Sequence, residues 1–329
     1  GTNEPLKGFK IVVDAGNGSG GFFATKVLEP LGADCTGSQF LDPDGMFPNH
    51  APNPEEKEAM ESATKAVLAS KADLGIVFDT DVDRSAVIDS FGKEINRNKL
   101  IAVLSHIALQ KEPGSTIVTD SVTSSGLKTF IESKGGIHLR YMRGYKNVIN
   151  KGIELNSKGI NAPLMIETSG HGAMKENYNL DDGAYLAVKI IIEAVKRKNA
   201  GGGGIGEILE SLKEPLESSE VRLKIANPEF KKVGSDVIEQ FKQAIESGYF
   251  EPNFVCAKEN FEGIRAESEA KGWFLLRSSL HDPVMVLNIE SDEEGGVNQE
   301  KRYAGLMARY KEEEGEELNE FQAWDATQI

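Results

Sequence analysis

Apolar and polar residues along the first eighty positions follow a pattern that predicts strands and helices in turn. Residues 9–14 form an apolar run rich in β-branched side chains, and residues 22–31 then show apolar positions at helical spacing. Residues 54–70 repeat the helical spacing, and residues 72–78 form a second apolar run that leads into acidic residues. Strands that alternate with helices usually pair in parallel, so the pattern predicts a sheet covered by helices.

A Pro113-Gly114 break separates this unit from a second one with the same alternation. The expected strands cover residues 116–119, 137–141 and 162–166, and the expected helices cover residues 126–133, 146–151 and 183–198. The four consecutive glycines at 201–204 are typical of a flexible surface loop rather than of a phosphate cradle.

The pattern changes again near residue 218. A strand with Val221 and Leu223, a helix over residues 236–247 and a hairpin-like stretch over residues 263–289 are typical of a small α+β domain. Beyond it, the acidic run at 311–317 reads as a solvated helix face.

A chain of 329 residues exceeds the roughly 100–200 residues of one domain, so more than one core is expected. We predict an α/β fold with two consecutive three-layer α/β/α domains that have mixed sheets, followed by a smaller α+β domain. The expected boundaries are residues 1–110, 111–217 and 218–329.

Composition narrows the classes of function. A formal net charge of −15 would repel nucleic acid and anionic membranes, so we expect neither as a partner, and an anionic substrate needs a local basic pocket. The chain holds no apolar run of about 20 residues and no visible targeting segment. Its two cysteines, Cys35 and Cys256, have no metal-ligand spacing, which favours a reducing compartment such as the cytoplasm or the plastid stroma.

The strongest local motif follows the second apolar run, where residues 78–84 read Phe-Asp-Thr-Asp-Val-Asp-Arg. Three carboxylates on one tight loop need a compensating cation. Mg²⁺ prefers oxygen ligands and keeps positions open for water and phosphate, so Asp79, Asp81 and Asp83 are candidate magnesium ligands. Arg84 would pair with a phosphate oxygen beside the metal.

Two other interpretations of this loop stay open. It can be a solvated acidic loop without a ligand. An apolar strand followed by Asp-x-Asp also begins the haloacid-dehalogenase-type phosphatases, in which the first Asp, here Asp79, is the nucleophile. That family prefers Thr or Val where this chain has Asp83, and a third carboxylate favours metal binding.

A glycine-rich turn at residues 16–21 matches the G-x-G-x-x-G dinucleotide pattern between a strand and a helix. Asp14 at the strand end would crowd a pyrophosphate, and tight packing of strand on helix explains such glycines more often than a cofactor does. The match is therefore weak.

Two further loops carry polar groups at strand ends. Residues 167–171 read Glu-Thr-Ser-Gly-His and could bind sugar hydroxyls, although a loop histidine is by itself a modest signal. Residues 277–283 read Arg-Ser-Ser-Leu-His-Asp-Pro, and an Arg with hydroxyls and backbone amides around it can hold a phosphate. Alone, this second stretch could equally be a surface turn.

Taken in order, Asp79-x-Asp81-x-Asp83-Arg84, Glu167-x-Ser169-Gly170-His171 and Arg277-x-Ser279 with Pro283 resemble the phosphoglucomutase and phosphomannomutase superfamily. Three further stretches, at residues 13–18, 44–54 and 143–146, look like landmarks of the same family. The resemblance covers residues 8 to 290 or so and implies the α-D-phosphohexomutase fold.

Members of this family have four domains, and these landmarks are similar to those of the second, third and fourth. The first domain carries a serine beside a histidine in a Thr-Ala-Ser-His-Asn-Pro-like loop, and no such stretch occurs in these 329 residues. We therefore expect a fragment that is inactive as it stands, whose partner is the phosphoserine-bearing domain of the same protein.

The resemblance implies that the complete enzyme interconverts hexose 1-phosphate and hexose 6-phosphate through a bisphosphate that turns around in the cleft. It assigns Mg²⁺ to Asp79, Asp81 and Asp83, catalytic roles to Arg84, Lys146 and His171, and substrate contacts to Glu167, Ser169, Arg277, Ser279 and His281. Of these, Arg277 and Ser279 would hold the distal phosphate. Phosphoryl transfer relies mainly on positioning and charge stabilisation, which suits these groups.

Two departures from the family leave the preferred sugar open. His281-Asp282 stands where many members have a hydroxyl residue before the proline, and Tyr145 stands where His or Phe is common. A non-catalytic sugar-phosphate-binding homologue is the alternative from another class of function.

Overall fold

The computed structural model describes residues 3–225, 227–248, 254–279 and 282–296. The chain divides into two compact units. One comprises residues 1–123 and 127–212, and the other comprises residues 124–126 and 213–329. Each unit has its own hydrophobic core and is described by itself.

The first sheet of the first unit has the order β1 (Ile11–Asp14), β2 (Leu74–Phe78), β3 (Ser85–Asp89) and β4 (Glu94–Ile95). β1 and β2 are parallel, whereas β2–β3 and β3–β4 are antiparallel, so the sheet is mixed. β1 and β2 are apolar runs buried on both faces, which requires a helical layer on each side.

The two faces of this sheet pack against different helices. Val12, Val77 and Ile88 share one cluster with buried residues of α1 (Lys57–Ser70). Ile76 and Val87, whose positions alternate with these, belong to a larger cluster that includes residues of α5 (Gly183–Asn199) and α2 (Asn98–Lys111). The predicted three-layer arrangement is confirmed.

The second sheet of the first unit has the order β6 (Ile137–Arg140), β5 (Thr116–Thr119), β7 (Leu164–Ile166) and β8 (Gly172–Met174). β5 is parallel to both β6 and β7, and β8 is antiparallel to β7. α4 (Tyr145–Ser157) covers the face of Val118 and Met165. α3 (Ser125–Ser133) contributes Leu127 and Phe130 to the cluster on the other face.

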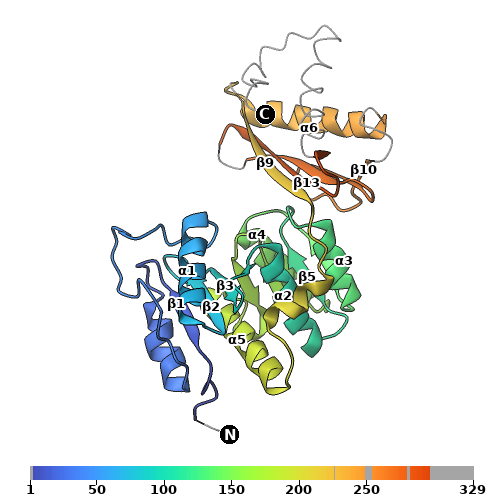
Figure 1. Ribbon diagram of the computed structural model, residues 1–329. Coiled ribbons are helices and arrows are strands. Elements are labelled where there is room, and N and C mark those ends of the chain that lie inside the picture. Colours follow the sequence, from blue (N-terminus) through green and yellow to red (C-terminus); the bar gives the residue numbers. More distant parts are fainter. Residues whose placement is uncertain (1–2, 226, 249–253, 280–281, 297–329) are drawn as a thin grey trace. The chain divides into compact units, whose positions relative to one another are not determined.

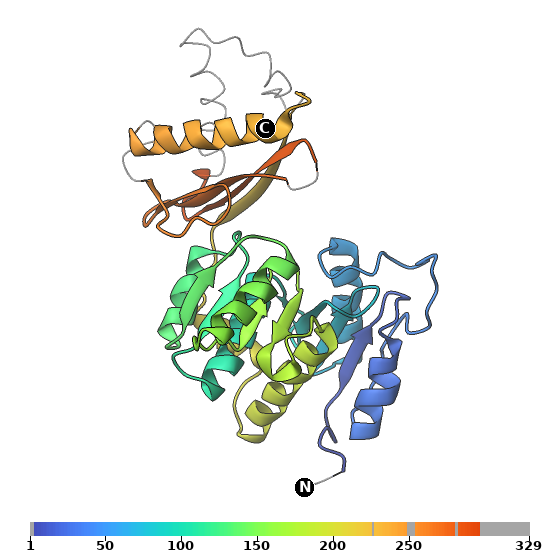
Figure 2. The same ribbon diagram turned by 180° about the vertical axis from the view of Figure 1, so that it is seen from behind.

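The large hydrophobic cluster extends through both α/β/α sandwiches of the first unit. Side chains from both sheets and from α2 and α5 belong to it, for example Val13, Ile117 and Ile190. This continuity fixes the two sheets, and therefore the loops at their strand ends, relative to each other (Figures 1 and 2).

The helix predicted at residues 22–31 differs in kind from the expectation. It forms a π-helix, η1 (Phe23–Leu28), followed by a 3₁₀ turn, η2 (Glu29–Leu31), which ends at Gly32 with φ 93°. Pro30 lies within the 3₁₀ turn and has no backbone N–H, so no helix hydrogen bond can be made from it. Two further 3₁₀ helices, η3 (Lys175–Asn177) and η4 (Ile205–Ser211), lie later in the first unit.

The second unit is an antiparallel sheet with one long helix. The strand order is β10 (Val255–Cys256), β11 (Ile264–Ser268), β12 (Gly272–Ser278), β13 (Val284–Ser291) and β9 (Glu217–Lys224), with every pair antiparallel. α6 (Phe230–Glu246) packs Phe241 and Ile245 on the sheet residues Phe274 and Leu276 (Figure 1). The expected helix at 236–247 thus begins earlier, at Phe230.

In the described part of the chain, no helix combines the length and the apolar character that crossing a membrane requires. The acidic run at 311–317 lies outside the described residues.

Truncating Phe274 tests whether the second core is independent of the first. Its ring lies 5.5 Å from Phe241 and 5.1 Å from Phe254, centroid to centroid. Phe274→Ala should lower the unfolding free energy of the second unit by about 3–5 kcal/mol and leave the first unit's transition unchanged in calorimetry. Phe91→Ala, at a ring that is 77% exposed, is the matched control and should change stability by less than about 0.5 kcal/mol. An equal loss in both transitions would contradict separate cores.

Candidate functional site

The three aspartates of the sequence motif lie on one tight loop. β2 ends at Phe78, the loop spans residues 79–84, and β3 begins at Ser85. The backbone N–H of Asp79 donates to the carbonyl of Arg84 at 3.3 Å, which closes the loop. Asp79, Asp81 and Asp83 each offer a carboxylate oxygen, and these oxygens lie within 4.8 Å of one another. The structure therefore brings the predicted ligands together.

Asp79 organises the loop from its buried end. The backbone N–H groups of Val82 and Arg84 donate to Asp79 Oδ1 at 3.0 and 3.1 Å, and the Nε of Arg84 donates to Oδ2 at 2.9 Å. Val82 adopts φ 73°, a left-handed conformation that is strained for a β-branched residue. The Asp79 hydrogen bonds hold the chain in this strained turn.

The glycine-rich turn at residues 16–21 supports the same loop from behind. Both the backbone N–H and the hydroxyl of Ser19 donate to the carbonyl of Thr80, at 2.9 and 3.0 Å. A Cβ on Gly18 would lie 2.8 Å from that carbonyl oxygen, so only glycine allows the approach. Close packing thus accounts for this glycine without a dinucleotide.

The crowding of carboxylates shifts the pKa of Asp83. Burial, followed by the hydrogen bond and the charge of Asp79, raises the pKa of Asp83 to about 7. Its Oδ1 is buried and has no hydrogen-bond partner among the described residues. A divalent cation would ligate this oxygen and offset the repulsion, so the donor set fits Mg²⁺.

Arg84 connects the acidic loop to the segment that contains Asn53 and Glu55. The sequence did not link this segment to the acidic loop. Its NH1 donates to Asn53 Oδ1 at 3.3 Å and lies 3.6 Å from Glu55 Oε2. Both partners belong to the family-like stretch at residues 44–54 or follow it directly. The guanidinium is thus held on two sides.

The loop between β7 and β8 lies against the acidic loop. Arg84 and His171 form an isolated antiparallel β-bridge, and the N–H of Gly183 donates to the carbonyl of Val82 at 3.1 Å. A Cβ on Gly183 would lie 2.5 Å from the carbonyl carbon of Arg84. The start of α5 therefore touches the acidic loop, and the two loops predicted from the sequence form one site.

Glu167 begins this second loop and is buried. The backbone N–H of Gly144 donates to its Oε1 at 2.6 Å, and the hydroxyl of Ser169 lies 3.5 Å from its Oε2. Burial, then the charge of Asp120, raises the pKa of Glu167 to about 7. Asp120 is fully buried and accepts from the N–H and the hydroxyl of Thr168, at 3.2 and 2.8 Å.

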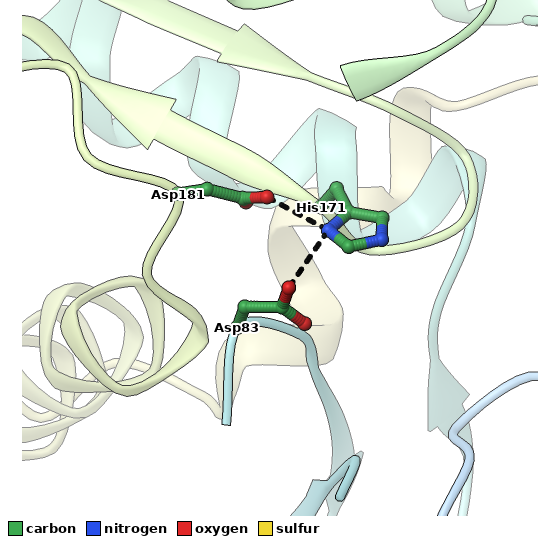
Figure 3. A group of neighbouring side chains, drawn as sticks. All are labelled: Asp83, His171 and Asp181. Atoms are coloured by element: carbon green, nitrogen blue, oxygen red, sulfur yellow. Dashed lines mark hydrogen bonds and ion pairs between the residues drawn. The ribbon is translucent and has the colours of Figure 1, made fainter. Parts of the chain in front are cut away.

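His171 ends the loop between two carboxylates. Its Nδ1 lies 2.8 Å from Asp181 Oδ2 and 3.5 Å from Asp83 Oδ2, as Figure 3 shows. Burial alone would lower the pKa of His171, but the hydrogen bond and charge of Asp181 and the charge of Asp83 raise it overall. Nδ1–H directed at Asp181 leaves Nε2, on the opposite side of the ring, for a ligand (Figure 3).

Lys146 is an exposed residue at the start of α4. It follows Tyr145, whose ring stacks on the ring of His171. The rings of Tyr145 and His171 are 4.9 Å apart and nearly parallel, at 22°. Lys146 Nζ lies 5.9 Å from the centroid of the Tyr145 ring. Tyr145, the departure noted in the sequence, thus joins Lys146 to His171.

The remaining predicted residues belong to the second unit. Arg277 lies near the end of β12, and its Nε is 3.7 Å from Glu262 Oε1. The hydroxyl of Ser279 accepts from the N–H of Asp282 at 3.3 Å. His281 lies outside the described residues. That these residues contact the substrate stays a prediction.

Sequence reasoning missed Asp181 and Asp120, and it included Asn53 in a family landmark without linking it to Arg84. Asp181-Asp182 before Gly183 looks like a helix start, and Asp182 is indeed the N-cap of α5, accepting from the N–H of Tyr185 at 2.9 Å. One helix cap needs only one carboxylate, so the extra aspartate of the pair, Asp181, is the signal in the sequence for a further role.

Comparisons with known proteins identify the family of this chain. Residues 2–92 match the model of the phosphoglucomutase/phosphomannomutase alpha/beta/alpha domain II, and residues 96–214 match that of domain III. Fold and matches together define a protein of the phosphohexomutase class. The chain belongs to the phosphoglucomutase/phosphomannomutase family and contains its domains II and III.

Individual relatives extend the likeness beyond these domains. A phosphomannomutase/phosphoglucomutase of Pseudomonas putida is 30% identical over 304 residues, which are 90% of this chain and 59% of that protein. A family protein from Burkholderia thailandensis superposes with a TM-score of 0.77 at 27% identity, over 92% of this chain and 61% of the other. The chain thus spans about three fifths of the length of these relatives.

A more distant structure shares the fold alone. Aspergillus fumigatus N-acetylphosphoglucosamine mutase, solved in complex with GlcNAc-6P and magnesium, is 12% identical with a TM-score of 0.55, over 90% of this chain and 66% of that one.

Magnesium and protons should compete at Asp83. The apparent affinity for Mg²⁺ should rise about tenfold per pH unit up to about pH 7 and level off above it, as measured by calorimetry. The bound proton stabilises the metal-free fold below about pH 7, and this contribution is lost as the pH rises through the raised pKa. Asp83→Asn should bind Mg²⁺ weakly, whereas Asp34→Asn, at a partner of Lys10, should bind like wild type. A pH-independent affinity would count against Asp83 as a ligand.

Asp181 should set the protonation of His171. Asp181→Asn removes a hydrogen bond and a charge that favour the imidazolium, so the pKa of His171 should fall. The imidazole can be followed by NMR because the chain has only 5 histidines. Asp182→Asn, which removes an equal charge at the adjacent position and keeps the helix cap, should leave the His171 titration in place. An unchanged titration in Asp181→Asn would be evidence against the pair.

Proposed function

We propose that this chain supplies the metal-binding and sugar-binding domains of a phosphohexomutase that interconverts hexose 1-phosphate and hexose 6-phosphate through a bisphosphate. The observation that carries the proposal is the bridged pair of loops, with the three-aspartate group and Arg84 on one and Glu167 and His171 on the other. The names of the relatives, phosphomannomutase and phosphoglucomutase, support the reaction class.

Domain boundaries at residues 110 and 217 remain part of the proposal, with residues 218–329 as the family's domain IV. The family matches at 2–92 and 96–214 and the break between compact units at residue 212 support them. The structural likeness to the Burkholderia protein over 92% of the chain supports the assignment of the C-terminal part.

Mg²⁺ held by Asp79, Asp81 and Asp83 would neutralise charge on the transferring phosphoryl group. The chain's own groups act around it. Arg84 pairs with a phosphoryl oxygen, and Glu167 and Ser169 bind sugar hydroxyls. The hydroxyl oxygen of the sugar forms its bond to phosphorus while the ester bond between phosphorus and the serine oxygen of the phosphoserine domain breaks. The hydroxyl proton passes to His171 Nε2, and the serine oxygen leaves as its alcohol after taking up one proton from solvent. Lys146, beside Tyr145, adds positive charge at the same end.

A nucleophilic role of Asp79, as in an aspartyl-phosphate phosphatase, fits less well. The carboxylate is 2% exposed and both of its oxygens accept hydrogen bonds from Val82 or Arg84. An oxygen that already accepts hydrogen bonds in a buried loop is poorly placed to attack phosphorus. Non-catalytic sugar-phosphate binding remains the second candidate.

Joining the chain to a phosphoserine domain of the kind that the family resemblance implies tests the activity. The joined protein should convert glucose 1-phosphate or mannose 1-phosphate to the 6-phosphate with Mg²⁺, and Asp81→Asn should reduce the rate at least about a hundredfold. Asp42→Asn, on an exposed loop of the same unit, is the control.

Three other results would redirect the proposal. Sugar-phosphate binding with no turnover would favour the non-catalytic homologue. Asp79-dependent hydrolysis of p-nitrophenyl phosphate by the chain alone would favour the phosphatase. Neither binding nor turnover would contradict the proposal.

A further inference from the structure

Arg277 has a resident carboxylate neighbour. β11 and β12 pair with Ile264 opposite Leu276, which places the turn before β11 beside the end of β12. Glu262 on this turn lies with its Oε1 3.7 Å from Arg277 Nε. The two side chains are only 18% and 13% exposed. The charge of Arg277 is therefore balanced inside the second unit.

Backbone geometry keeps Glu262 at this position. Gly263 has φ 56°, and a Cβ there would lie 2.1 Å from the carbonyl oxygen of Leu276 and 2.8 Å from the Cα of Arg277. Only glycine lets the turn rest directly on the Arg277 backbone. The approach of Glu262 to the guanidinium is thus a consequence of the fold and not of a flexible surface side chain.

The pair is longer than a charge-assisted hydrogen bond, which usually measures about 2.7–2.9 Å. Arg265, on the same sheet, makes such a bond to Glu267 at 2.7 Å. At 3.7 Å, Glu262 balances the charge of Arg277 without a short hydrogen bond at Nε. A largely buried Arg needs a counter-charge in the absence of a ligand, and a long ion pair provides one that a better acceptor can replace.

The same arrangement recurs in the first unit. Glu55 Oε2 lies 3.6 Å from Arg84 NH1, and the side chains of Arg84 and Glu55 are 20% and 28% exposed. Arg84 also makes its short bond to Asp79. Both arginines expected to bind phosphate therefore have a glutamate oxygen within 3.7 Å of the guanidinium. A phosphate bound to either guanidinium would be repelled by the nearby glutamate carboxylate, because both groups are negatively charged.

We propose that Glu262 is a placeholder for the substrate phosphate on Arg277. Glu262 holds the guanidinium before the phosphate binds and is displaced when it binds. This inference rests on the proposed function, because it takes the Arg277 loop as a phosphate site. Glu262 contacts the binding group and not the reacting atoms, so it is a positioning residue. Because Glu262 competes with the phosphate for Arg277, it lowers the affinity of this site for the distal phosphate. The lower affinity favours release of that phosphate when the bisphosphate turns around.

Phosphate titration of the 329-residue chain, followed by NMR at the backbone amides of Arg277, Ser278 and Ser279, tests this directly. Glu262→Gln keeps the size of the side chain and removes its charge, so the dissociation constant for inorganic phosphate should fall about tenfold. Glu269→Gln, an equal change of charge on an exposed turn of the same sheet, should change it less than about twofold. Arg277→Gln should abolish the response.

The outcomes separate this inference from the proposed function. If Arg277→Gln abolishes binding while Glu262→Gln leaves it unchanged or weaker, Glu262 is no placeholder, and the phosphate site of the proposed function survives. If neither wild type nor Glu262→Gln responds to phosphate, both the placeholder and the phosphate role of this loop are overturned. If Glu262→Gln fails to fold, Glu262→Asp, whose shorter side chain withdraws the charge, should still bind phosphate more tightly than wild type, and weaker binding would overturn the inference.

Discussion

Repulsion between carboxylates is the constraint on which the first unit depends. Three aspartates offer oxygens within 4.8 Å of one another, and one of them, Asp83, has a pKa raised to about 7 in consequence of burial and of its neighbour Asp79. A loop with this much like charge would open unless other contacts held it. Each structural feature around it supplies such a contact.

The contacts come from four separate segments. Asp79 binds the loop's own backbone, Ser19 binds the carbonyl of Thr80, Asn53 holds Arg84, and Gly183 at the start of α5 binds the carbonyl of Val82. Because the core of the first unit is continuous through both sheets, these segments keep their positions relative to one another. The bridge between Arg84 and His171 then places the second loop, and with it Glu167, beside the carboxylates.

Local patterns in the sequence were enough for the architecture and for the residues of both loops. The buried strands β1 and β2 and the convergence of Asp79, Asp81 and Asp83 follow from apolar runs that end in polar residues. The antiparallel strands β3 and β8, which make the sheets mixed, were not among the strands that these runs predicted. What the sequence could not supply were contacts between distant segments. Asp181 and Asn53 meet His171 and Arg84 only after α5 and the loop at residues 44–54 have packed, and no local spacing encodes that. The π-helix of η1 was missed because its apolar spacing resembles that of an α-helix.

Anomalous diffraction from crystals of this chain grown with Mn²⁺ is the most direct test of the central claim, because Mn²⁺ takes the same oxygen ligands as Mg²⁺ and is visible at its absorption edge. The account predicts one strong peak at about 2.1–2.3 Å from a carboxylate oxygen of each of Asp79, Asp81 and Asp83, with Arg84 still on Asp79. A loop with the three carboxylates turned apart and no peak between them, at saturating Mn²⁺, would contradict it.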